Sequence, residues 1–146
     1  MPKRAIRRHV PKIFISYAAV DKVLVHKIRN VLEISVDASI STDEDLSAGG
    51  DWMSQLRQAI EDSDYMVAVL TPQSVRSAFV VPEISAAWAL GKPIIPLVTR
   101  RQILNAVPIA MDESQTIILP DLDDPAAAEE LGKRFSQIIG LHSVQS

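Results

Sequence analysis

The feature that most constrains this fold is a regular alternation of short apolar segments with stripes of helical spacing. The apolar segments have the length of β-strands, and we predict strands at residues 12–17, 35–41, 64–70, 94–98 and 116–119. The run 64–70 is almost continuously apolar, which is typical of a strand that is buried on both faces of a parallel sheet. The alternation therefore predicts an α/β domain.

Between these strands, apolar side chains recur at helical spacing. The predicted helices cover residues 20–32, 52–60, 82–91 and 124–139. Asp21 is placed to cap the first helix, Pro82 suits the first position of the third, and Gly91 supplies a stop signal at its end. Residues 100–112 have an ambiguous pattern that fits one weak helix.

Five units of this kind predict a flavodoxin-like three-layer sandwich, with a five-stranded parallel sheet of order 2-1-3-4-5 and helices on both faces. In this order the first and third strands are neighbours. Ligands bind such sheets in the crevice beyond the carboxyl ends of the strands. Residues 17–20, 42–51 and 71–82 should surround that crevice, and the middle segment is expected to be a long, exposed acidic loop.

The length of 146 residues suits one domain with one core. We expect a basic flexible tail at 1–11, the domain at 12–141 and a C-terminal tail at 142–146. No segment approaches the roughly 20 apolar residues of a membrane-spanning helix. The basic start is not followed by the apolar segment of a signal peptide. A cytoplasmic protein with no membrane partner is therefore expected.

Charge and residue counts exclude several classes of function. A net charge of −3 gives the chain no electrostatic footprint for nucleic acid. The chain has no cysteine, which rules out disulfides, thiol nucleophiles and Cys-ligated zinc. The three histidines, His9, His26 and His142, lack the paired spacing of metal ligands. We expect no metal and no nucleic-acid partner.

Common nucleotide-binding and hydrolytic motifs are also missing. The five glycines form neither GxGxxG nor GxxxxGK[ST], so the usual phosphate cradles are absent. A phospho-acceptor domain of this topology needs an aspartate at the end of the third strand, where this chain has Leu70 and Thr71. No histidine falls on a crevice loop, so a Ser/His/Asp triad is not expected.

One acidic residue stands at the predicted crevice. Glu83 follows Pro82 in the first turn of a helix, where the helix dipole favours a carboxylate. An ordinary acidic residue of a first helical turn is the alternative interpretation. Phe79 is suited either to stack on a flat heterocycle or to anchor the loop in the core. Trp52 and Trp88 are interpreted as packing residues on their helices.

Four segments, in order, resemble the signatures of the Toll/interleukin-1 receptor (TIR) family, in particular its bacterial NAD+-cleaving members. Residues 12–17 with Asp21 resemble the first signature, and 43–52 resemble the BB loop that leads into the second helix. Residues 77–83 resemble the segment with a serine, an aromatic residue and a glutamate, and 91–97 resemble the strand that follows. The resemblance covers nearly the whole chain.

The resemblance implies one of two functions. TIR enzymes of bacterial and plant defence cleave NAD+ at the nicotinamide bond and release nicotinamide with ADP-ribose or a cyclic ADP-ribose signal. TIR domains of animal receptor adaptors are instead non-catalytic scaffolds that bind one another. Glu83 matches the catalytic glutamate of the enzymes, which implies NAD+ as a substrate, no cofactor and self-association with other TIR domains. A nucleoside deoxyribosyltransferase-like enzyme is a further alternative.

The resemblance also assigns roles to other residues. Substrate binding is implied for Phe14, Ser16, Tyr17, Asp43, Asp45 and Phe79, and a self-association loop for Gly49, Gly50 and Asp51. The chain departs from the family at Phe79, where Trp is common, and at Val80, where Cys is common. Val81 and Pro82 stand where basic residues often precede the glutamate. These departures bear on rate and substrate contacts more than on the type of reaction.

Overall fold

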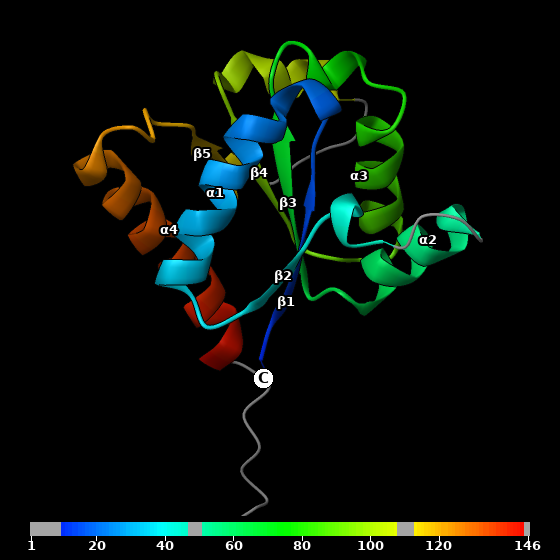
Figure 1. Ribbon diagram of the computed structural model, residues 1–146, viewed down its shortest axis with the longest axis horizontal. Coiled ribbons are helices and arrows are strands. Elements are labelled where there is room, and N and C mark those ends of the chain that lie inside the picture. Colours follow the sequence, from blue (N-terminus) through cyan, green and yellow to red (C-terminus); the bar gives the residue numbers. More distant parts are fainter. Residues whose placement is uncertain (1–9, 47–50, 108–112, 145–146) are drawn as a thin grey trace, which may run out of the picture.

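The computed structural model describes residues 10–46, 51–107 and 113–144 (Figure 1). Within these residues, five parallel strands form one sheet of order β2-β1-β3-β4-β5, which confirms the predicted fold class and strand order. The strands are β1 (Lys12–Ser16), β2 (Ser39–Ser41), β3 (Tyr65–Leu70), β4 (Ile94–Val98) and β5 (Ile117–Ile118).

Helices cover both faces of the sheet. The α-helices are α1 (Lys22–Ser35), α2 (Trp52–Asp62), α3 (Val80–Ala89) and α4 (Pro125–Val144). Short 3-10 helices occupy η1 (Ala19–Asp21), η2 (Asp43–Asp45), η3 (Ser74–Arg76), η4 (Arg101–Ala106) and η5 (Glu113–Gln115). Figure 1 shows α1 and α4 on one side of the sheet and α2 and α3 on the other, so the fold has three layers.

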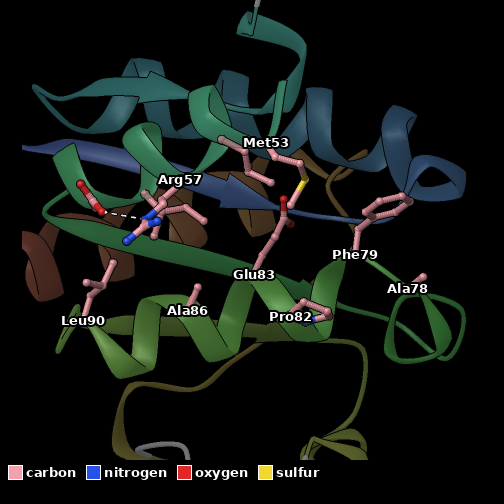
Figure 2. Close-up of a pocket in the computed structure, with 11 residues that line it drawn as sticks. Met53, Arg57, Ala78, Phe79, Pro82, Glu83, Ala86 and Leu90 are labelled. Carbon is pink, nitrogen blue, oxygen red and sulfur yellow. Dashed lines mark hydrogen bonds and ion pairs between the residues drawn. The ribbon is translucent and has the colours of Figure 1, made fainter. Parts of the chain in front are cut away.

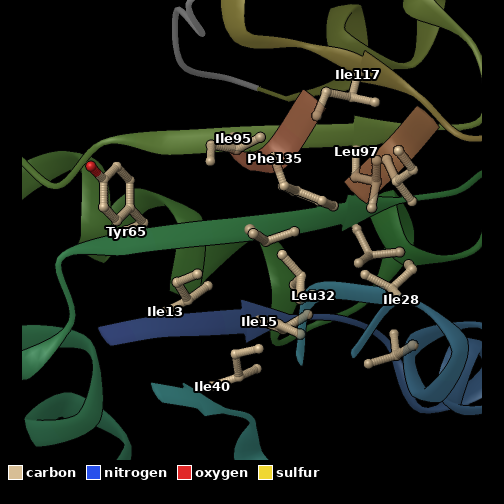
Figure 3. Close-up of a cluster of buried hydrophobic side chains, with 14 of the residues drawn as sticks. Ile13, Ile15, Ile28, Leu32, Ile40, Tyr65, Ile95, Leu97, Ile117 and Phe135 are labelled. Carbon is tan, nitrogen blue, oxygen red and sulfur yellow. The ribbon is translucent and has the colours of Figure 1, made fainter. Parts of the chain in front are cut away.

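Each face of the sheet has its own apolar core, because successive side chains of a strand point to opposite faces. Ile13 and Ile15 of β1 belong to the core under α1 and α4, shown in Figure 3, whereas Phe14 belongs to the core under α2 and α3. All residues of β3 are buried, as the continuous apolar run predicted. The two cores fix β1 and β3 side by side, with Ser16 opposite Ala68.

Several helix boundaries differ from the predicted ones. The third helix begins at Val80 and not at Pro82, and Phe79 stands at its N-cap position. Proline is tolerated anywhere in a first helical turn, where its missing N–H needs no partner, so it could not mark the first residue. The predicted weak helix in 100–112 is partly present as η4, and residues 108–112 lie outside the described part of the chain.

Two side chains have roles that the sequence did not indicate. The Asp21 carboxylate makes no capping hydrogen bond to α1 and instead accepts one of 2.8 Å from the Thr71 hydroxyl, which ties η1 to the end of β3. Trp88 is 55% exposed, so its interpretation as a packing residue was wrong. Trp52 is half-buried against the core under α2 and α3, in agreement with its predicted packing role.

The chain ends are described in part. Pro11 is buried and its carbonyl accepts a hydrogen bond from Ser39 N, so this last residue of the predicted tail is part of the fold. Residues 1–9 lie outside the description. At the other end, α4 continues to Val144, into the segment 142–146 that we expected to be a tail. No described helix has both the length and the apolar character to cross a membrane.

Candidate active site

Glu83 is a buried carboxyl group at the carboxyl ends of the central strands. It lies in the first turn of α3 and is 7% exposed. The hydroxyl of Ser16, the last residue of β1, donates a hydrogen bond of 2.6 Å to Glu83 Oε1. The predicted position of Glu83 at the switch point, where β1 and β3 are neighbours, therefore agrees with the structure.

The environment of Glu83 raises the pKa of its carboxyl group to about 7. Burial is the largest cause, because it disfavours the charged form. The hydrogen bond from Ser16 lowers the pKa, and the negative charge of Asp43 raises it further. We expected the helix dipole to favour the carboxylate, but desolvation outweighs it in this structure.

Asp43 and Tyr17 form a second polar pair on the neighbouring loops. Burial is the largest cause that raises the pKa of the Tyr17 hydroxyl, and the neighbouring Asp43 carboxylate raises this pKa further. Among the described residues, Oδ1 of Asp43 is a buried oxygen with no hydrogen-bond partner. The Asp43 carboxylate thus lies close enough to Glu83 for its negative charge to raise the pKa of Glu83.

A pocket of about 510 Å³ opens beside Glu83, between α2 and α3 (Figure 2). Its size is within the range of small-molecule sites, about 300–1,000 Å³. Most of its lining is apolar, and the charged side chains are Glu83 with Arg57 and Glu61 of α2. The full lining is Met53, Leu56, Arg57, Ile60, Glu61, Ala78, Phe79, Pro82, Glu83, Ala86 and Leu90.

Phe79 stands at the wall of this pocket and is 61% exposed. Its ring meets that of Trp52 edge to face, with ring centroids 6.4 Å apart and an interplanar angle of 80°. This exposure excludes the alternative in which Phe79 anchors the loop in the core. The ring is therefore open to a ligand, and its stacking on a heterocycle stays a prediction.

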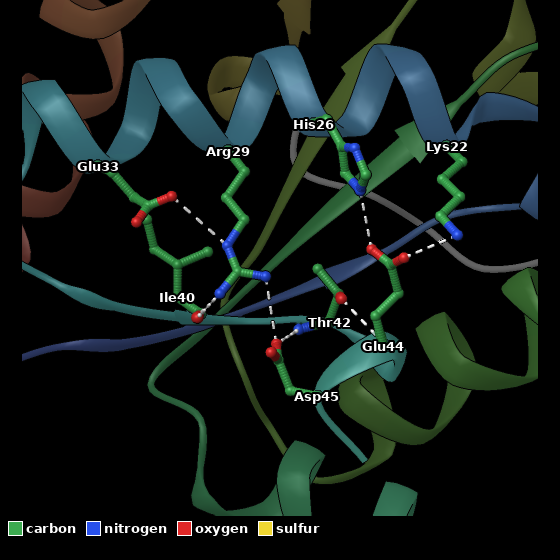
Figure 4. A network of polar contacts seen from close by, with 8 residues as sticks. All are labelled: Lys22, His26, Arg29, Glu33, Ile40, Thr42, Glu44 and Asp45. Carbon is green, nitrogen blue, oxygen red and sulfur yellow. Dashed lines mark hydrogen bonds and ion pairs between the residues drawn. The ribbon is translucent and has the colours of Figure 1, made fainter. Parts of the chain in front are cut away.

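The first half of the acidic segment is fixed to α1 (Figure 4). Thr42 and Asp45 form a capping box around η2. The Glu44 carboxylate lies 3.0 Å from the side-chain nitrogens of both His26 and Lys22. Both partners lower the pKa of the Glu44 carboxyl group, and His26 has the larger effect. Residues 42–46 are thus tied to one another and to α1 by polar contacts, while Glu44 and Asp45 remain exposed, as expected for this segment.

The structure gathers some of the predicted site residues and separates others. Ser16 and Glu83 are hydrogen-bonded to each other. Asp43, Tyr17 and Phe79 lie near this pair. Phe14 is only 1% exposed and belongs to the core under α2 and α3, so it offers a substrate no surface.

Two further carboxylates of the predicted set have structural partners. Asp45 accepts hydrogen bonds from Thr42 N (2.8 Å) and Arg29 (3.3 Å), on the side of α1. Asp51 caps α2 by accepting from Ser54 N at 3.1 Å. Gly49 and Gly50, assigned to the self-association loop, lie outside the described residues.

Sequence reasoning missed the walls of the pocket. Met53, Arg57 and Glu61 share one stripe of α2, and Pro82, Ala86 and Leu90 share one stripe of α3. Their helical spacing was visible, but nothing in the sequence indicated that the two stripes face each other. Within the described residues, no group of three or more His, Asp or Glu is placed to hold a metal ion.

Comparison with known proteins places this geometry in a family. A family model described as the TIR domain matches residues 13–135. No curated protein sequence matches the chain significantly. Many solved structures match its fold, among them three at low identity.

The TIR domain of the Toll-related receptor TRR-2 from Hydra magnipapillata is 17% identical, with a TM-score of 0.61 over 87% of this chain and 96% of that one. The CMP N-glycosidase BcmB of Clostridium botulinum is 19% identical, with a TM-score of 0.53 over 84% and 96%. The TIR domains of the activated Roq1 resistosome are 15% identical, with a TM-score of 0.52 over 84% of each chain. Because the family match spans most of the sequence and the strand order agrees, the chain belongs to the TIR domain family.

Proposed function

We propose that this TIR domain is an NAD+ nucleosidase that cleaves the bond between nicotinamide and ribose, with Glu83 as its catalytic residue. The observation that carries the proposal is the buried Glu83 carboxyl, held by Ser16 and forming part of the wall of the pocket between α2 and α3. Polar groups that meet in a mostly apolar pocket, with a perturbed pKa, are the usual features of an active site.

The reaction needs little from the protein beyond one carboxylate. The glycosidic C–N bond breaks, its electron pair leaves with nicotinamide as a neutral pyridine, and the ribose becomes oxocarbenium-like. An ionised Glu83 stabilises this positive charge, as carboxylates do in glycoside hydrolysis. Water then adds to the ribose carbon and loses a proton to give ADP-ribose, or a nitrogen of the adenine adds to give the cyclic product.

The raised pKa of Glu83 suits a substrate with a positive charge. At a pKa of about 7 the free site holds the glutamate partly protonated near neutral pH. The cationic nicotinamide ring of NAD+ favours the carboxylate when it binds next to it. Binding therefore draws Glu83 into the ionised form that the reaction requires, and NAD+ is consumed as a substrate, not retained as a cofactor.

The comparisons support this proposal at the level of the fold. The relative described as a CMP N-glycosidase is named for cleavage of an N-glycosidic bond, so a protein of similar fold carries out related chemistry. The Roq1 resistosome, whose TIR domains share this fold, is described as directly recognising a pathogen effector. We accordingly propose a role in immune or anti-phage defence signalling, with self-association of TIR domains and a cytoplasmic location.

A second candidate is a non-catalytic scaffold for TIR–TIR interaction. Its support is the exposure of two large apolar side chains at the end of α3, where Trp88 is 55% and the C-cap residue Leu90 is 48% exposed. Large apolar side chains exposed on a surface are available for contacts with another protein.

Product analysis separates these functions. Concentrated protein is incubated separately with NAD+, CMP and deoxynucleosides, and the products are identified by mass. Nicotinamide with linear or cyclic ADP-ribose, from NAD+ alone, is the expected result. Release of free base from CMP or a deoxynucleoside in its place would assign another N-glycosidic substrate. No cleavage of any of them, together with self-association, would support the scaffold.

A further inference from the structure

The pocket beside Glu83 continues as a groove along α2 and α3, well beyond the reacting bond. Figure 2 shows Phe79 at one end of the groove, Glu83 nearer the middle and Leu90 at the other end. Glu83 in α3 and Leu90 at its C-cap lie seven residues apart, which corresponds to about 10 Å along the helix axis. This length exceeds what a nicotinamide ring needs, so the groove has room for a second part of the substrate.

Among the described residues that line this groove, Arg57 is the single cation. It stands between Glu83 and Leu90 in Figure 2, and its Nε contacts Glu61 at 3.2 Å. The Arg57 side chain is 81% exposed, and an exposed i,i+4 pair contributes little to stability. The guanidinium group can therefore exchange this partner for an anion at small cost.

The distance along α2 between Met53 and Arg57 matches the distance in NAD+ between the glycosidic carbon and the diphosphate. Met53 lines the pocket together with Glu83, and Arg57 follows Met53 by one helical turn, about 6 Å along the axis. In NAD+ the ribose ring and its 5′ methylene separate the glycosidic carbon from the diphosphate, a span of the same order. A ribose at Glu83 thus brings the diphosphate to the level of Arg57.

We propose that the α2–α3 groove is the binding site for the non-reacting part of the dinucleotide, with Arg57 as its diphosphate-binding residue. Guanidinium groups bind phosphate oxygens in a bidentate manner, with charge-assisted hydrogen bonds. Glu61 opposes this binding, because its carboxylate competes for Arg57 and repels the phosphates. The inference rests on the proposed NAD+ cleavage and adds to it how the substrate is held.

The test compares substrates with and without phosphate in four proteins. Nicotinamide riboside carries the same scissile bond as NAD+ but has no diphosphate. Wild type is compared with Arg57→Gln, Glu61→Gln and the control Lys133→Gln. Lys133 also pairs with a glutamate four residues away on an exposed helix surface, but α4 covers the opposite face of the sheet.

Arg57→Gln should raise the KM for NAD+ about tenfold and leave kcat nearly unchanged, because the contact is equal in the ground state and the transition state. Its KM for nicotinamide riboside should stay that of wild type. Glu61→Gln should lower the KM for NAD+, and Lys133→Gln should change neither constant. Equal KM values for NAD+ in Arg57→Gln and Lys133→Gln, or equal losses on both substrates, would overturn the proposal.

The failure of this inference is separable from failure of the proposed function. If wild type cleaves NAD+ through Glu83 but Arg57→Gln behaves like the control, only the groove assignment falls. If wild type does not cleave NAD+, the proposed function is rejected. Calorimetric measurement of ADP-ribose binding then tests whether the groove binds the non-reacting part of the dinucleotide. Binding that Arg57→Gln weakens about tenfold supports the site, and no binding, or binding that the substitution leaves unchanged, rejects it.

Discussion

Ser16 at the end of β1 donates a hydrogen bond of 2.6 Å to Glu83 in the first turn of α3, across 67 positions of sequence. The bond is buried, and it lowers the pKa of Glu83, against burial and the charge of Asp43, which raise it. It therefore joins the first TIR signature to the glutamate of the third and increases the ionised fraction of this glutamate.

The activity should rise with pH through the pKa of Glu83. Because the proposed reaction needs the carboxylate, kcat/KM for NAD+ should increase up to an apparent pKa near 7 and stay level above it. Ser16→Ala removes a contact that lowers this pKa, so its rising limb should move to higher pH. Initial rates of nicotinamide release between about pH 5 and 9 measure both effects.

Ser63→Ala is the matched control for this measurement. Ser63 is also buried, but its hydroxyl donates a hydrogen bond of 2.7 Å to the carbonyl of Ala59 near the end of α2 and not to Glu83. Its profile should coincide with that of wild type. A flat profile in the wild type, or a Ser16→Ala profile with an unmoved limb, would contradict the assigned role of the bond.

Glu83→Gln should stabilise the fold at alkaline pH relative to wild type. The folded pKa of about 7 lies above the ordinary 4.5, so the favourable contribution of protonated Glu83 is complete below pH 4.5 and is lost as pH rises through 7. A shift of this size corresponds to about 3 kcal/mol. The neutral amide avoids this loss and keeps an oxygen to accept from Ser16.

Denaturant unfolding of wild type and Glu83→Gln at about pH 5 and pH 8 measures this effect. The difference in unfolding free energy should move in favour of the variant between the two pH values. An identical difference at both would show that Glu83 titrates at its ordinary pKa in the folded protein.

Phe79→Ala should weaken the use of NAD+ without unfolding the domain. The ring is 61% exposed, and its edge contact with Trp52 contributes at most about 1.5 kcal/mol to stability. Stacking of an aromatic side chain on a base is worth roughly 1–3 kcal/mol, so the KM should rise at least several-fold. Steady-state kinetics beside a melting curve give both quantities.

Trp88→Ala offers the control for Phe79, since Trp88 is an exposed aromatic residue of the same helix but does not line the pocket. It should leave the KM unchanged. If Phe79→Ala folds with full activity, the ring has no part in substrate binding.

Much of this fold was predictable because its signals are local. The run of β3 and the apolar stripes of α1 and α2 each specify an element from a few neighbouring residues, and alternation then fixes the parallel topology. The third helix was harder. Its sequence is apolar on most sides, so periodicity could not show that Ile84 is buried while Trp88 is exposed.

The position of Glu83 was predictable, but its ionisation was not. The helix dipole is a local property that the sequence shows, whereas burial of Glu83 depends on how α3 packs on β1 and on the nearby Asp43. The same reason hid the groove, because its two walls come from helices separated by β3. The ion pairs of Glu44 and Asp45 were hidden for the same reason, because their partners Lys22, His26 and Arg29 belong to another part of the chain.

Assembly is expected to control the activity. The resemblance to enzymatic TIR domains implies that neighbouring subunits complete the site through the loop that contains Gly49 and Gly50, so specific activity should rise with protein concentration over about a hundredfold range. A Gly49→Pro, Gly50→Pro double variant should lose this rise, because proline fixes the backbone of the contact loop. Constant specific activity in the wild type, or an unchanged curve in a folded double variant, would indicate a self-sufficient monomer.

The central claim is that Glu83 carries the cleavage of NAD+, and the rate of nicotinamide release by concentrated wild-type and Glu83→Gln protein near pH 8 tests it most directly. At this pH wild-type Glu83 is mostly ionised, and the variant differs from it by one charge in a fold that it does not destabilise. Loss of one electrostatic contact to a transition state typically lowers the rate by about 10² to 10³. The account predicts a loss of this size in a folded variant, and a Glu83→Gln protein that keeps more than about a tenth of the wild-type rate would contradict it.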